Sequence, residues 1–118
     1  MNGRILVVDD EENIRQLYDE ELSGEGYDVV TVDSGESAVS ALDDHDPQLV
    51  VLDIRMAGDD GLDVLASIKA RNRKMPVILN SAFSTYKNDF KSWLADAYVV
   101  KSSDLTELKA KIRELLRF

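Results

Sequence analysis

The sequence contains no cysteine, few prolines and no long apolar run, and its basic residues are outnumbered by acidic ones. The lack of cysteine excludes disulfides and thiolate-bound metals. Lysine and arginine together number 14, against 23 aspartates and glutamates, so the formal net charge is −9. Nucleic acids and anionic lipid surfaces are bound through basic patches, and this charge balance therefore argues against direct binding to either.

The N-terminus does not have the character of a targeting signal. Its apolar run, Ile5 to Val8, is too short, and Asp9 follows directly. No segment approaches the roughly 20 apolar residues of a membrane-spanning helix. We therefore expect a cytoplasmic protein. The 118 residues, of which 44% are hydrophobic, fit one domain over residues 1–118, because the last predicted helix reaches the end of the chain.

Short apolar runs alternate with amphipathic segments along the chain. Strand-length runs occupy residues 5–8, 29–32, 49–52, 77–79 and 98–100. Helical spacing of apolar residues occurs at 12–23, from 34 to about 42, around 62–68, at about 85–94 and after 103 or 104. Continuous apolar strands in this alternation predict a parallel sheet with helices on both faces. We predict a flavodoxin-like, doubly wound α/β fold with strand order 2-1-3-4-5 and five helices.

Polar residues follow these apolar strands at one edge of the predicted sheet. Asp9 and Asp10 end the first strand, Asp53 the third, Ser81 the fourth and Lys101 the fifth. Ligands of doubly wound sheets bind at the carboxyl ends of the strands, so we expect these side chains to converge. Each residue alone has an ordinary structural explanation, as a turn residue, a helix cap or a solvated lysine. The ordinary explanation of the set requires all five to be placed there by accident.

The chemistry of this set is that of phosphoryl transfer. Three crowded carboxylates repel one another and call for a cation, and Mg²⁺ takes carboxylates together with phosphate oxygens and water. Lys101 supplies a positive charge and Ser81 a hydroxyl, both suited to phosphoryl oxygens. Asp53 is then free to act as the nucleophile and to form an acyl phosphate.

Four short motifs occur in a fixed order on these elements. They are Ile5 to Glu12, Leu52 to Met56 followed by Asp60-Gly61, Ser81-Ala82, and Ala97 to Lys101. In these motifs the chain resembles the receiver domain of two-component response regulators, and the resemblance covers nearly all of it. The resemblance implies a phosphorelay protein that receives its phosphoryl group from a histidine kinase or a histidine phosphotransfer protein.

The resemblance also implies a role for each matching residue. Asp53 becomes the phosphoacceptor and a metal ligand. Asp10 binds Mg²⁺ directly, Asp9 binds it directly or through water, and the backbone carbonyl of Arg55 is a further ligand. The self-phosphorylation and self-dephosphorylation of such a domain depend on Mg²⁺, although it is a signalling domain rather than an enzyme.

The switch residues implied by the resemblance lie on the fourth and fifth strands. Ser81 and Lys101 hold phosphoryl oxygens, and the ring of Tyr98 moves inward as the serine hydroxyl swings towards the phosphate. A downstream protein then binds the face formed by the fourth helix, at about Thr85 to Leu94, the fifth strand and the fifth helix. Four aromatic residues are expected to pack in or around that fourth helix: Phe83, Tyr86, Phe90 and Trp93.

Two prolines usual in the family are missing. Met56-Ala57 stands where the family usually has Met-Pro, and Lys101-Ser102 stands where it usually has Lys-Pro, often with a cis bond. A cis bond without proline costs about 2.5–4 kcal/mol, so we expect a trans bond after Lys101 and an altered loop. Every group needed for the chemistry is retained.

Three functions remain open from the sequence. The first is a stand-alone receiver, and the second is the receiver part of a longer transcriptional or enzymatic regulator. The third is a Mg²⁺-dependent phosphatase that forms an aspartyl-phosphate on itself. Phosphatases with a haloacid-dehalogenase-like site carry an acid two residues after the nucleophile, and this chain has Arg55 there. Arginine cannot serve as a general acid or base at neutral pH, which disfavours the third function.

Overall fold

A computed structural model describes residues 3–56, 58–82 and 94–116 of the chain. Five strands form a parallel sheet in the order β2-β1-β3-β6-β7. The strands are β1 (Arg4–Val8), β2 (Asp28–Val32), β3 (Leu49–Leu52), β6 (Val77–Ser81) and β7 (Ala97–Val100). In chain order this is the predicted arrangement 2-1-3-4-5, so the doubly wound fold is confirmed.

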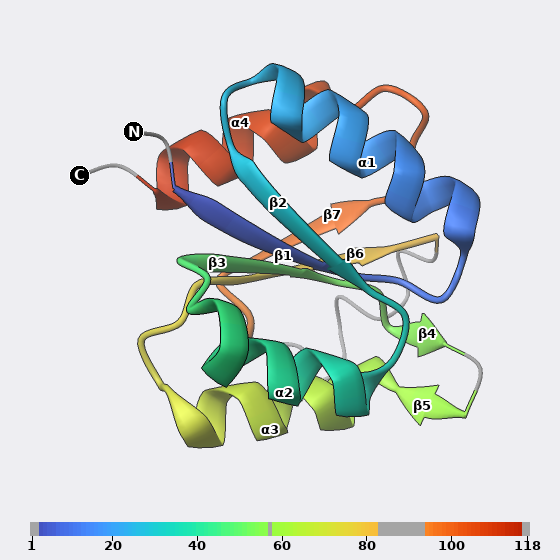
Figure 1. The fold of residues 1–118 in the computed structure, drawn as a ribbon. Helices are drawn as coiled ribbons and strands as arrows, with labels where there is room; N and C mark the ends of the chain where they lie inside the picture. Colours follow the sequence, from blue (N-terminus) through green and yellow to red (C-terminus); the bar gives the residue numbers. More distant parts are fainter. Residues whose placement is uncertain (1–2, 57, 83–93, 117–118) are drawn as a thin grey trace.

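Helices cover both faces of the sheet (Figure 1). The pair α1 (Glu12–Gly24) and α4 (Thr106–Leu115) lies on one face, and the pair α2 (Gly35–His45) and α3 (Gly61–Arg71) lies on the other. These are four of the five predicted helices. The remaining one, expected at about Thr85 to Leu94, falls almost entirely within residues 83–93, outside the described residues, together with the four aromatic residues assigned to it.

The two helical layers bury separate cores because neighbouring side chains of a strand point to opposite faces. The strand residues of the α2/α3-side core are Leu6, Val8, Val50, Leu52, Val77 and Leu79. Those of the α1/α4-side core are Ile5, Val7, Leu49, Val51, Ile78 and Val99. Burial on both faces explains why the strands of this sequence are continuously apolar.

The segment after β3, at residues 54–60, has neither an apolar run of strand length nor helical spacing. It contains a small antiparallel pair, β4 (Arg55–Met56) and β5 (Asp59–Asp60). Gly58 lies in the turn of this pair with a φ of 78°, a conformation that favours glycine. Strands of two residues are too short to produce a hydrophobic period, which is why the sequence pattern did not indicate them.

The start of α3 is pressed against the backbone that follows the third strand. A Cβ atom on Gly61 would lie 2.2 Å from the carbonyl oxygen of Asp53, so only glycine fits there. The Gly61 amide donates to the Ile54 carbonyl at 2.6 Å, and the Asp60 side chain caps the helix by accepting from the Leu62 amide at 2.9 Å. This contact fixes the position of the backbone directly after Asp53.

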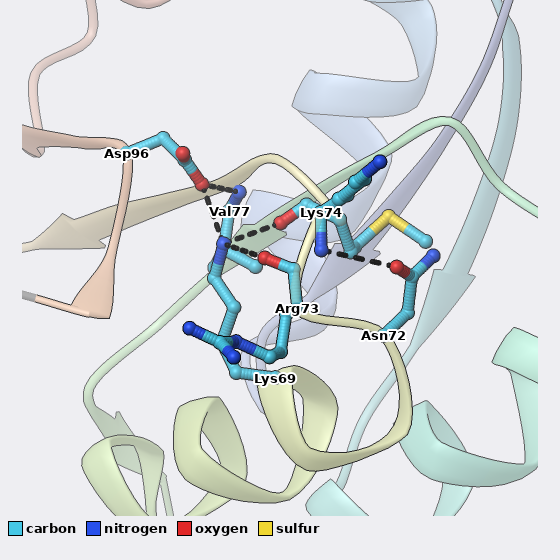
Figure 2. A network of polar contacts seen from close by, with 7 residues as sticks. Lys69, Asn72, Arg73, Lys74, Val77 and Asp96 are labelled. Carbon is cyan, nitrogen blue, oxygen red and sulfur yellow. Dashed lines mark hydrogen bonds and ion pairs between the residues drawn. The ribbon is translucent and has the colours of Figure 1, made fainter.

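A partly buried lysine joins the amino ends of β6 and β7 (Figure 2). Lys69 donates to the Met75 carbonyl at 2.6 Å and to the Asp96 carboxylate at 2.8 Å, and its side chain is only 12% exposed. The same Asp96 oxygen accepts from the Val77 amide, while the Asp96 amide donates to the Val77 carbonyl, both at 2.8 Å. The network therefore sets the register in which β7 enters the sheet.

In the described part of the chain, no helix has both the length and the apolar character needed to cross a membrane.

Candidate functional site

Three aspartates converge at the carboxyl edge of the sheet, as predicted. Val8 of β1 pairs with Leu52 of β3, so Asp9 and Asp53 each lie one step beyond paired residues. Carboxylate oxygens of Asp9, Asp10 and Asp53 all lie within 4.8 Å of one another. Asp9 and Asp53 are only 2% and 5% exposed, and Asp10 is half-buried.

Lys101 completes this cluster from the other side of β6. Its ammonium nitrogen lies 2.8 Å from a carboxylate oxygen of Asp9 and 3.2 Å from one of Asp53. Because β6 separates β7 from β3, the lysine side chain must reach across the end of β6 to make these contacts. The Lys101 amide donates to the Ser81 carbonyl at 2.7 Å, which anchors the start of the loop.

The bond between Lys101 and Ser102 is trans, as expected, since the described residues contain no cis peptide bond. The lysine still reaches both carboxylates. The loss of the family's usual proline therefore does not displace the ammonium from the acidic cluster. The other missing proline is at Ala57, which lies outside the described residues.

Ser81 and Tyr98 also come together, on neighbouring strands. Ser81 is the last residue of β6 and is 1% exposed. Tyr98 pairs in register with Leu79, two residues before the serine, and its partly buried ring packs against the α2/α3-side core. By the alternation of strand side chains, Ser81 belongs to the same face as Leu79. The predicted switch pair thus shares one face of the sheet.

Burial and charge perturb the two ionisable groups at the centre of the site. Burial raises the pKa of the Asp53 carboxyl from 3.8 to about 6, and the negative charge of Asp9 adds to this rise against the opposing effect of Lys101. Burial alone would lower the pKa of the Lys101 amine. Its hydrogen bond to Asp9 and its attraction to Asp53 outweigh that effect, so its pKa is raised. One ammonium therefore stands among three carboxyl groups, and a further cation would relieve their repulsion.

Backbone contacts hold the two buried aspartates. One Asp9 carboxylate oxygen accepts from the Glu11 amide at 2.9 Å, and the guanidinium of Arg15 donates to the Asp9 carbonyl at 2.8 Å. The Asp53 carboxylate accepts a longer bond, 3.4 Å, from the Arg55 amide. The contact of Arg15 with the Asp9 carbonyl was not predicted, because the helical spacing of residues does not show where a long side chain ends.

The donor set of the cluster fits a hard divalent cation. Carboxylate oxygens are the protein ligands that Mg²⁺ prefers, and it commonly uses one or two of them beside water and phosphate oxygens. The three aspartates each offer a carboxylate oxygen, and these oxygens lie within 4.8 Å of one another. Arg55, whose backbone carbonyl is a predicted further ligand, begins β4 two residues after Asp53.

A second polar pair lies below the acids and was not predicted from the sequence. Tyr18 lies on α1 and is only 2% exposed. Its hydroxyl accepts a hydrogen bond of 2.5 Å from the side-chain amide of Asn80, which is also 2% exposed. These residues are 62 positions apart, so only the sheet order brings them together. A polar residue between Leu79 and Ser81 in a buried strand was the available signal.

A parallel five-stranded sheet with three aspartates and a lysine at its carboxyl edge is the architecture of a receiver domain. The family model for the response regulator receiver domain matches residues 5–113. The chain belongs to this family of signalling domains.

Similar proteins support the same assignment. The chain is 34% identical over 122 residues to the alkaline phosphatase synthesis transcriptional regulatory protein PhoP of Bacillus subtilis, covering 99% of this chain and 50% of PhoP. It is 40% identical over 116 residues to the probable transcriptional regulator ycf27 of Cyanophora paradoxa, covering 97% of this chain and 48% of that protein. The chain thus spans about half the length of these curated relatives.

Among solved structures, the response regulator protein TrrA of Thermotoga maritima, in complex with Mg²⁺-BeF, has a TM-score of 0.92 and 47% identity. That match covers 95% of this chain and 97% of TrrA. TrrA in complex with the histidine kinase ThkA matches with a TM-score of 0.90 and 48% identity, covering 96% of this chain and 97% of that chain.

Proposed function

We propose that this receiver domain accepts a phosphoryl group on Asp53 and uses it as a switch for partner binding. The observation that carries the proposal is the cluster of the buried Asp9 and Asp53 with the half-buried Asp10, in which Lys101 is bonded to two of the three carboxylates. A cluster of this kind is costly to bury unless it serves a charged ligand, because the acids repel one another.

The metal ligands in this proposal are the three aspartates and the backbone carbonyl of Arg55. Bound Mg²⁺ would supply positive charge to balance the acids and the phosphoryl oxygens. Arg55 itself is exposed. The chain's own residues perform the rest of the reaction.

In the proposed transfer, a carboxylate oxygen of Asp53 attacks the phosphorus of a phosphohistidine. A bond forms between that oxygen and phosphorus, the bond from phosphorus to the imidazole nitrogen breaks, and the nitrogen takes up a proton. Lys101 and the Ser81 hydroxyl stabilise the phosphoryl oxygens, whose negative charge is spread in the transition state. The attacking carboxyl must be ionised, and the positive charge of Lys101 favours the ionised form of Asp53.

The proposed donor is a histidine kinase or a histidine phosphotransfer protein. The similar regulator TrrA occurs in a solved complex with a histidine kinase, and it also occurs with Mg²⁺-BeF. High similarity over nearly the full length of both chains supports the same class of partner for this domain.

The proposed output is a change on the α2/α3-side of the site. Ser81 and Tyr98 share that face, so movement of the serine hydroxyl to a phosphoryl oxygen would free space for the tyrosine ring. The downstream protein would bind a face that includes β7 and α4, together with the helix expected at about Thr85 to Leu94.

Phosphorylation of wild type and of Asp53→Asn tests the proposal. Each protein is incubated with Mg²⁺ and acetyl phosphate, and its intact mass is measured with and without EDTA. We expect the wild type to gain one phosphoryl group only when Mg²⁺ is present, and the variant to gain none. No gain in the wild type, or an equal gain in both proteins, would refute the assignment.

The length of the curated relatives supports a second possibility, a receiver that belongs to a longer transcriptional regulator. Sequencing of the native reading frame distinguishes this from a stand-alone receiver. The phosphatase alternative predicts turnover of a generic phosphate ester that is lost in Asp53→Asn. We expect no such turnover, because Arg55 occupies the place of the required acid.

A further inference from the structure

The buried pair Tyr18–Asn80 is the least expected feature of the α1/α4-side core. Tyr18 belongs to this apolar core, and the pair contains three polar atoms that are buried away from water. The Asn80 amide nitrogen donates to the Tyr18 hydroxyl at 2.5 Å, while the amide oxygen has no hydrogen-bond partner among the described residues. An unpaired buried acceptor carries a desolvation penalty, and two leucines would fill this space without one.

The sheet register places this pair directly beside the phosphoacceptor. Leu52 of β3 pairs with Leu79 of β6, so the next residues along, Asp53 and Asn80, are neighbours. Side chains two positions apart on a strand point to the same face. Asp9, Asp53 and Asn80 each lie two positions after a strand residue of the α1/α4-side core, so all three belong to that face. Across the carboxyl edge this face therefore presents Asp9, Asp53 and Asn80 in order.

Lys101 crosses the end of β6, the strand that carries Asn80. The lysine follows Val99, which pairs in register with Asn80, by two residues and therefore lies on the same face. From there its ammonium reaches Asp53 and Asp9 on the far side of β6. Burial raises the pKa of the Tyr18 hydroxyl. The hydrogen bond with Asn80 and the charge of Lys101 oppose this rise, and the charges of Asp9 and Asp53 add to it. The pair and the charged cluster are thus in electrostatic contact.

We propose that Tyr18 and Asn80 are positioning residues of the phosphoryl site: Tyr18 orients the Asn80 amide below Lys101, and the amide oxygen, which has no partner in the described part of the chain, becomes a neutral acceptor for the ammonium once Asp53 is phosphorylated. This inference rests on the proposed function. An ammonium has three N–H donors, and two of them are directed to carboxylates in this structure. Phosphorylation converts one of those carboxylates into an acyl phosphate, so a neutral acceptor nearby keeps Lys101 aligned with the phosphoryl oxygens.

The proposal predicts that stability and phosphorylation rate can be separated. Replacing both members, as Tyr18→Phe with Asn80→Leu, removes the unpaired acceptor together with its partner. Such apolar replacement of a complete pair is close to neutral for stability, so we expect a melting temperature no lower than that of the wild type. The rate of phosphoryl gain at saturating donor should nevertheless fall about tenfold, because small errors in the placement of a catalytic group are costly.

Two further measurements distinguish positioning from general support of the fold. The control is Ile5→Val. Ile5 belongs to the same face of the sheet as Asp9 but lies near the amino end of β1, away from the site. This substitution should lower the melting temperature and leave the rate of phosphoryl gain unchanged. Magnesium affinity, measured by calorimetry without any phosphodonor, should stay within about twofold of wild type in the double variant, since all three carboxylate ligands are retained.

The experiment follows phosphoryl gain from acetyl phosphate by intact mass in wild type, the double variant, Tyr18→Phe alone and Ile5→Val. A folded double variant that gains the group as fast as wild type would overturn the proposal. If the double variant does not fold, Tyr18→Phe decides: a rate equal to that of Ile5→Val overturns the proposal, and a selectively lower rate supports it. A wild type that gains nothing overturns the proposed function as well, so the two failures are distinguishable.

Discussion

The replacement Asp53→Asn should make the metal-free protein more stable at neutral pH, although it removes a partner of Lys101. Asparagine has nearly the same shape as aspartate and carries no charge. The pKa of Asp53 is raised from 3.8 to about 6 by burial and by Asp9, despite the opposing pull of Lys101. Each unit of pKa shift corresponds to 1.36 kcal/mol, so ionised Asp53 costs the folded state about 2 to 3 kcal/mol.

The sign of the pH dependence follows from the direction of the shift. Because the folded pKa lies above the unfolded one, the favourable contribution of protonated Asp53 is complete below about pH 4 and is lost as the pH rises through about 6. The stability gap between Asp53→Asn and wild type should therefore be largest above pH 7 and should close towards pH 4. On the proposed ligand set, Mg²⁺ should stabilise the wild type more than Asp53→Asn, which lacks one carboxylate ligand. Its addition at pH 7.5 should therefore narrow the stability gap between the two proteins.

Urea denaturation in EDTA, at a series of pH values, measures this gap. The matched control is Asp44→Asn, which neutralises an exposed aspartate of α2 and should leave the unfolding free energy nearly unchanged. A variant Asp53→Asn that is less stable than wild type at pH 7.5 in EDTA would contradict the reasoning. It would mean that the contact with Lys101 outweighs the cost of burying the carboxylate.

Three other substitutions test the remaining parts of the structure. Lys101→Met should destabilise the metal-free protein by about 3 kcal/mol, because it leaves two buried carboxylates without their cation. Addition of Mg²⁺ should restore much of the lost stability. An unchanged urea midpoint would argue against the ion pairs. Gly61→Ala should lower the unfolding free energy by about 2–3 kcal/mol or prevent folding, because the added Cβ would lie 2.2 Å from a backbone oxygen. Gly24→Ala is the control, since a Cβ there has no neighbour within 4 Å. Thermal melts should show it to be neutral or stabilising. Lys69→Met should lower the unfolding free energy by about 1–2 kcal/mol, and hydrogen exchange at the Val77 amide should rise; equal protection would show that the network does not hold β7.

The fold was predictable because its strands are continuous apolar runs with a polar residue at each carboxyl end. Once the strand order is set, Asp9, Asp53 and Lys101 have to meet at one edge, and the structure confirms that they do. The resemblance to receiver domains added the individual roles, which remain predictions. The fold prediction depends on apolar runs of strand length and on apolar residues that recur about every four positions, and both are visible in a single sequence.

The features that escaped prediction have no such period. The β4–β5 pair consists of two-residue strands, and its formation depends on the turn at Gly58. The pairing of Tyr18 with Asn80 depends on which helix packs over which strand, and both residues occupy positions that an apolar side chain could fill. Arg15 bonds to a backbone carbonyl, a contact that leaves no trace in the spacing of charges. Contacts of this kind are specified by tertiary geometry rather than by local sequence.

The two-faced sheet has a consequence for how such a domain can diverge. Asp53, Lys101 and the Tyr18–Asn80 pair lie on the α1/α4 side of the sheet, whereas Ser81 and Tyr98 lie on the other. On the proposed roles, we expect substitutions behind Tyr98 to alter how strongly the domain responds while the rate of phosphoryl gain stays constant. We expect substitutions around Tyr18 to do the reverse. Speed and strength of response should thus be separable traits, each open to selection on its own side of a single sheet.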